Sequence, residues 1–62
     1  MDAIDLLLSK NAQERNDMIN FLATGNAKDY SHYQNICGII RGLNLADVHL
    51  KDLAERMEKS DE

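Results

Sequence analysis

The sequence predicts an all-α fold, a long and uneven helical hairpin, and three observations support this prediction. The 62 residues include no proline, so no backbone N–H is missing from a helix. A glycine at position 25 follows the first amphipathic stretch and marks a turn. The second half of the chain then carries apolar residues at alternating spacings of three and four, the period of a packed helix.

The first helix is predicted over about residues 3–24. Asp2 can act as its N-cap, and Asp5 completes an approximate capping box and suits the positive end of the helix. Its apolar stripe consists of Ile4, Leu7, Leu8, Ala12, Ile19 and Leu22. The polar residues that interrupt this stripe are Asn11, Arg15 and Asn16.

A tight turn is predicted at residues 24–26. Gly25 follows Thr24 and is typical of the left-handed residue just past a helix end. Asn26 offers an N-cap with Asp29 three residues later, so the next helix is expected from about residue 27. Two antiparallel helices follow from this turn.

The second helix, predicted over about residues 27–59, carries the strongest pattern in the sequence. Seven apolar residues form an a/d heptad pattern typical of a coiled coil, and no polar residue interrupts it. The heptad residues are Ile36, Ile39, Leu43, Ala46, Leu50, Leu53 and Met57. With its flanking residues the apolar arc spans about 220°, whereas a surface helix needs little more than about 100°. One neighbouring helix cannot cover this arc.

The unequal helix lengths also indicate that the second helix has apolar surface the first helix cannot cover. At 1.5 Å per residue the two helices measure roughly 33 Å and 50 Å. With a turn at residues 24–26, residue 46 is expected beside the start of the first helix. Four apolar residues would then extend beyond it without cover, namely Leu50, Leu53, Ala54 and Met57. The hairpin is therefore predicted to complete its core by oligomerisation or partner binding, and residues 60–62 to form a frayed acidic tail.

A compact three-helix domain is the alternative fold. Gly42 would end a helix over 27–41, and Asn44 would cap a third helix over 45–59, with Asp47 three residues on. Because the seven-member heptad pattern passes through Gly42 without a skip, the continuous helix is favoured.

Six residues are predicted to bind a partner. Small residues four apart allow another backbone to come close, which suggests a role for the two glycines of the second helix. The apolar residues near the end of that helix would act as anchors, and an exposed tyrosine near the turn would add contact area. These residues are Gly38, Gly42, Leu50, Leu53, Met57 and Tyr30.

No metal, cofactor or catalytic site is predicted, so the chain is not expected to be an enzyme. Helical metal ligands usually lie three or four residues apart, whereas His32, Cys37 and His49 are separated by five and twelve residues. Cys37 has no base and pocket beside it, so it is expected to pack as a small apolar residue. A single cysteine also forms no intrachain disulfide and suits a reducing compartment.

Charge and hydropathy disfavour nucleic-acid and membrane roles. The net charge is −4, and the seven basic residues are spread along the chain rather than clustered. The longest apolar run, Leu6 to Leu8, is far shorter than the roughly 20 residues of a membrane span. The acidic N-terminus lacks the basic start of a secretory signal, so a cytosolic protein is expected.

The second half of the sequence resembles a group of short proteins from tailed, podovirus-like phages, encoded near portal and capsid genes. The resemblance covers about residues 25–57 and includes Gly25 to Tyr30, Tyr33, Cys37, Gly38, Ile40 to Leu43, Ala46, Asp52 and Leu53. It implies a phage origin, a location in the host cytoplasm and the virion, and a role in the virion or its assembly. It implies no catalytic residue.

The expected function is therefore that of a small, non-enzymatic phage structural or assembly protein. It would act as a helical protein–protein interaction module that binds its own copies or a larger virion protein. The alternative is a regulatory binder whose acidic residues, including Asp47, Asp52, Glu55 and Glu58, inhibit a host enzyme or defence complex. A less favoured alternative is an RNA-binding hairpin dimer, similar in length and architecture to the bundle protein Rop.

Overall fold

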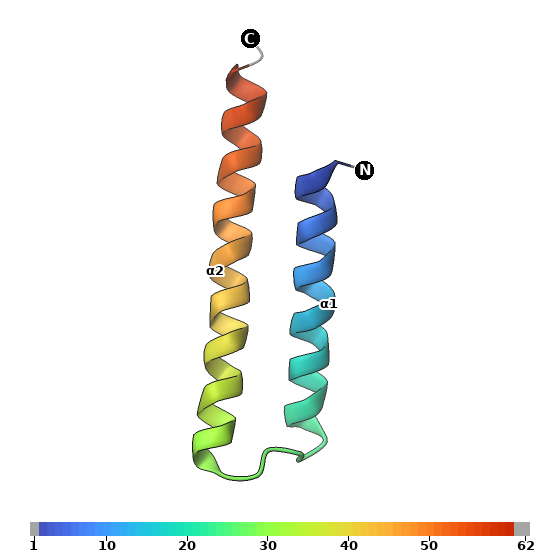
Figure 1. Ribbon diagram of the computed structural model, residues 1–62, viewed down its shortest axis with the longest axis vertical. Helices are drawn as coiled ribbons and strands as arrows, with labels where there is room; N and C mark the ends of the chain where they lie inside the picture. The colour runs from blue at the N-terminus through green and yellow to red at the C-terminus, as the bar shows by residue number, and fades with distance from the viewer. Residues whose placement is uncertain (1, 61–62) are drawn as a thin grey trace.

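The computed structural model describes residues 2–60 and consists of two antiparallel helices, α1 (Ala3–Ala23) and α2 (Tyr30–Ser60). They lie side by side and are joined by a loop over residues 24–29, and α2 continues past the start of α1 (Figure 1). The hairpin measures 51 × 19 × 12 Å. The prediction of an all-α, uneven helical hairpin is confirmed.

Both ends of α1 follow the predicted capping chemistry. The Asp2 carboxylate accepts a hydrogen bond from the Asp5 backbone N–H at 2.8 Å. Gly25 adopts a positive φ of 77°, and its N–H donates to the carbonyl of Leu22 at 3.1 Å. The N–H of the next residue donates to the carbonyl of Phe21 at 3.3 Å, which completes a Schellman motif.

The start of α2 lies three residues later than predicted. Asp29 is the N-cap, because its carboxylate accepts the His32 backbone N–H at 2.8 Å. The His32 side chain in turn accepts the Lys28 backbone N–H through Nδ1 at 3.0 Å. Asn26, the predicted cap, instead donates its side-chain amide to the Thr24 hydroxyl at 2.8 Å. The connection therefore spans residues 24–29 rather than 24–26.

α2 is one continuous helix through Gly42, so the compact three-helix alternative is wrong. An interior glycine costs about 1 kcal/mol relative to alanine, which is too little to break a helix held by a long apolar stripe. The helix includes Ser60, so this residue is not part of a frayed tail. The remainder of the predicted tail, residues 61–62, lies outside the described residues.

The register between the helices differs from the predicted one, so the predicted overhang is corrected, and the longer loop contributes to the difference. Asp47 lies beside Arg15, in the middle of α1, and the start of α1 lies beside Ala54 and Met57. Leu50 and Ala54 are half-buried rather than uncovered. Each added loop residue displaces the facing positions, because a helix rises about 1.5 Å per residue.

The side of α2 that faces α1 is rotated relative to the predicted heptad pattern. The buried or half-buried positions that point most directly at α1 recur at spacings of four and three, as in a coiled coil. They are Ile36, Ile40, Leu43, Asp47, Leu50 and Ala54. This α1-facing set shares Ile36, Leu43 and Leu50 with the predicted pattern, and Ala46 of that pattern is half-buried beside it. Ile36, at 5% exposure, is the one buried residue of the described chain.

Replacing two glycines by alanine should have opposite effects on stability. Nothing lies within 4 Å of a Cβ added at Gly38, so Gly38→Ala should stabilise the helix by about 1 kcal/mol. Gly25→Ala should destabilise by about 1–2 kcal/mol, because an added Cβ disfavours a positive φ. Urea unfolding followed by circular dichroism measures both changes. Equal effects of the two substitutions would contradict the different backbone conformations.

Candidate protein-interaction surface

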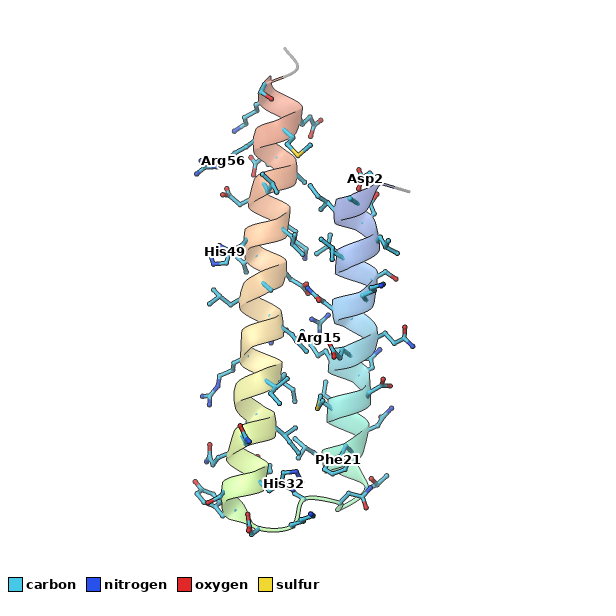
Figure 2. The ribbon with its side chains drawn as sticks, in the orientation of Figure 1. Asp2, Arg15, Phe21, His32, His49 and Arg56 are labelled. Atoms are coloured by element: carbon cyan, nitrogen blue, oxygen red, sulfur yellow. The ribbon has the colours of Figure 1, made fainter. Side chains whose placement is uncertain are left out.

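A polar cluster of Asn11, Arg15 and Asp47 lies in the middle of the hairpin. The Arg15 guanidinium donates to one oxygen of the Asp47 carboxylate at 2.8 Å, and the Asn11 side-chain amide donates to the other at 3.1 Å. Figure 2 shows Arg15 extending from α1 into the space between the helices. Polar residues that interrupt the apolar stripes of both helices therefore meet and satisfy one another.

Hydrogen bonding in this cluster changes the acidity of Asp47. The hydrogen bonds from Asn11 and Arg15 hold the pKa of the carboxyl below its ordinary value of 3.8. Since the carboxylate accepts bonds from two positions one turn apart on α1, it can do so in only one register. The cluster therefore restrains the alignment of the two helices.

The hairpin leaves much of its apolar surface exposed. Its accessible area is 4924 Å², whereas a compact folded chain of 7.0 kDa exposes only about 4,000 Å². Large apolar side chains are exposed along both helices. They are Leu6, Leu7, Ile19, Tyr30, Tyr33, Ile39, Leu45, Val48, Leu53 and Met57. Two helices alone therefore do not complete a core.

One broad side of the hairpin gathers apolar side chains from both helices. At about 100° per residue, these side chains point to the same side of the plane that contains the helix axes. We call this side the apolar face. Its apolar residues are Leu7, Met18, Ile39, Ala46, Leu53 and Met57, and Glu14 and Asn35 lie among them.

A groove of about 370 Å³ opens on the apolar face near the loop. Phe21 and His32 lie at this end of the hairpin in Figure 2, with their rings edge to face at a centroid separation of 5.6 Å. The groove is lined mainly by apolar side chains, which suits an apolar ligand side chain. The lining residues are Asp17, Met18, Phe21, His32, Asn35, Ile36 and Ile39.

The opposite broad side carries a mixed surface. By the same helical geometry, Ile19, Tyr33, Ile40 and Val48 lie there among polar and charged residues. These polar residues are Asp5, Asn16, Asn44, Lys51 and Glu58. The apolar face is the stronger candidate for a docking site, because it also carries the groove lined by Phe21, Ile36 and Ile39.

The structure brings only part of the predicted partner-binding set together. Leu53 and Met57, 47% and 54% exposed, lie on the apolar face, and Gly42 lies at its edge. Leu50 is half-buried against α1 instead.

Gly38 and Tyr30 lie away from the apolar face. Gly38 lies on the side of α2 turned away from α1, where a Cβ would meet no atom within 4 Å. Tyr30 lies toward the mixed side and stacks on Tyr33 at a ring separation of 6.3 Å.

None of the predicted partner-binding residues lies on α1, although Leu7 and Met18 contribute to the apolar face. Leu7 belongs to the stripe expected to pack inside the hairpin, yet the structure leaves it exposed. The signal that could have identified it was the width of that stripe, since Leu7 and Leu8 cannot both point at a single neighbouring helix.

The residues considered for metal or nucleophile chemistry stay apart. His32 accepts a hydrogen bond from the Lys28 backbone N–H in the loop, whereas His49 points away from α1 (Figure 2). Cys37 is half-buried, and its contact with the Tyr33 hydroxyl raises the tyrosine pKa. Within residues 2–60, no three His, Cys, Asp or Glu side chains gather as a metal site would require.

Neither helix of the described chain combines the length and apolar character needed to cross a bilayer. Comparisons with protein-family models, with curated proteins and with solved structures found no match to this chain.

Proposed function

We propose that the chain is a non-enzymatic helical protein-interaction module with a structural or assembly role in a phage particle. The observation that carries this proposal is the apolar face, which the hairpin leaves uncovered, while Ile36 alone is buried among residues 2–60. A cluster of exposed apolar side chains beside an apolar groove is typical of a protein-docking site.

The energetics of a small domain support the same function. A core of this size supplies no more than about 3–5 kcal/mol without help from a disulfide, a metal or another chain. The single cysteine forms no intrachain disulfide. Covering the apolar face would add burial at about 25 cal/mol for each Å² removed from water. Association therefore provides the stability that two helices lack.

The phage setting rests on the resemblance of residues 25–57 to short proteins of podovirus-like phages. A structural or assembly protein presents its docking surface to its own copies or to a larger virion protein. Its apolar face would then hold it at a fixed stoichiometry in the particle or in an assembly intermediate.

Quantitative mass spectrometry of purified particles and assembly intermediates tests this function. Particles from the encoding phage should contain the chain at a constant copy number, and Leu53→Asp should reduce that number at least tenfold. The matched control Leu45→Asp, at a leucine that is 58% exposed on the far side of α2, should be incorporated normally. Absence of the wild-type chain from particles and intermediates alike would contradict a structural role and favour a host-directed binder.

A further inference from the structure

We infer that the occupant of the apolar face is a second copy of this chain, and that two hairpins form an antiparallel four-helix bundle. This inference rests on the proposed interaction function and names its partner. The two-fold axis lies in the plane between the two hairpins, runs at right angles to the helices and passes near Ala46. It places α2 of one protomer along α2 of the other, in opposite directions.

The exposed area matches what a stable dimer needs. The chain exposes about 900 Å² more than a compact monomer of its mass, and a standard interface buries about 800 Å² per partner. Its radius of gyration, 14.9 Å, likewise exceeds the roughly 11 Å of a compact chain of this length. Pairing two flat hairpins through one broad side would bury an area of this order and bring the shape closer to that of a compact domain.

The direction of the heptad pattern also requires a further helix pair. In a four-helix bundle each helix aims its apolar stripe at the bundle axis, between its two neighbours. At about 100° per residue, the heptad pattern of α2 is centred about 50° from the direction of α1 and is turned toward the apolar face. This rotation explains why Ile39 and Leu53 are exposed while Ile40 and Ala54 face α1.

Shape complementarity selects the direction of the second copy. The groove lies near the loop, between Phe21 and Ile39, whereas Met57 stands at the other end of the same face. A transverse two-fold axis near Ala46 brings Met57 of each protomer to the groove of the other. It also sets Ile39 opposite the partner copy of Leu53, and the small Ala46 lies where the two α2 helices cross.

Sedimentation equilibrium of the full chain over a dilution series tests the dimer. The wild type should have twice the mass of the 7.0 kDa chain, and Leu53→Asp should weaken dimerisation at least 100-fold. Leu45→Asp introduces the same charge on the far side of α2 and should dimerise like the wild type. Circular dichroism of the wild type and both variants at high concentration verifies that helicity is retained.

Disulfide trapping in a Cys37→Ser background tests the direction. Ala46→Cys should cross-link nearly completely under mild oxidation, since the transverse axis holds the two positions within the roughly 7 Å that a disulfide spans. Met57→Cys should not cross-link, because the two copies would lie about 33 Å apart along the bundle. If the two-fold axis ran along the helices instead, the two copies of residue 46 would lie diagonally across the bundle, too far apart to cross-link. A dimer without the Ala46→Cys cross-link would therefore overturn the transverse axis.

The outcomes separate this inference from the proposed function. A wild-type chain that stays monomeric up to millimolar concentration overturns the homodimer, even where the chain is present in phage particles at fixed stoichiometry. A dimer that both Leu53→Asp and Leu45→Asp leave intact overturns the assignment of the apolar face. Failure of the proposed function is measured independently, as absence from particles and intermediates.

Discussion

Ile36→Ala is expected to leave the chain largely unfolded at 25 °C. Removing a buried isoleucine side chain costs about 2–5 kcal/mol, and a core of this size supplies only about 3–5 kcal/mol. Ile36 is the single buried residue among those described, and it lies where the side of α2 facing α1 meets the groove. Its truncation therefore removes the best-covered apolar contact of the hairpin. Circular dichroism at 222 nm with urea titration measures the loss.

The matched control for this prediction is Ile19→Ala. Ile19 is 47% exposed on the mixed side of the hairpin, so its truncation removes little buried area and introduces a better helix former. The expected change is within about 0.5 kcal/mol, as for other surface substitutions. Equal losses from the two variants would show that the core is not centred on Ile36.

The helix boundaries at the N-terminus and after Phe21 could be predicted because local chemistry determines them. Asp2 and Gly25 act through bonds to residues within five positions, and no distant contact is needed to identify them. The continuity of α2 was likewise predictable. A regular heptad pattern continues unbroken past Gly42, and this outweighs the cost of one glycine.

The register could not be predicted, because the loop offers two residues able to cap α2. Asn26 and Asp29 are both good N-cap residues, and sequence alone gives no reason to prefer either. The structure favours Asp29, whose helix start is also held by the His32 side chain against the Phe21 ring. These contacts depend on the fold. The later helix start explains only part of the change in register, because three residues rise about 4.5 Å, whereas Ala54 rather than Ala46 lies beside the start of α1.

In the sequence, the residues of the polar cluster are recognisable only as separate polar interruptions of two apolar stripes. Arg15 interrupts the stripe of the first helix, and Asp47 intrudes on the apolar arc of the second. Their pairing across the hairpin depends on the register, since Asp47 could equally have paired with Lys51 on its own helix. Polar residues that interrupt both apolar stripes of a hairpin are therefore a useful restraint on its register, because they are expected to lie at the same level.

Asp47→Asn is expected to remove an acid-dependent part of the folding stability. The pKa of Asp47 in the folded chain lies below its ordinary value of 3.8, because the hydrogen bonds from Asn11 and Arg15 favour the ionised carboxyl. The native state therefore binds this proton less readily than the unfolded state. The stabilising contribution is fully present above the unfolded-state pKa and is lost as pH falls through the lower, folded-state pKa. Urea titrations between pH 6 and 2.5 should show this loss for the wild type and not for Asp47→Asn.

Asp52→Asn provides the matched control, because it makes the same chemical change in an exposed ion pair. The Asp52 carboxylate lies 3.1 Å from Arg56, with both side chains more than half exposed, whereas the Asp47 and Arg15 side chains are only 14% and 24% exposed. Water and salt screen the exposed pair, so its removal at neutral pH should cost less than removal of Asp47. Asp47→Asn also leaves Arg15 partly buried without its carboxylate, which adds a desolvation penalty that the control lacks. An equal loss from the two variants, or an unchanged acid response in Asp47→Asn, would show that the cluster does not fix the hairpin register.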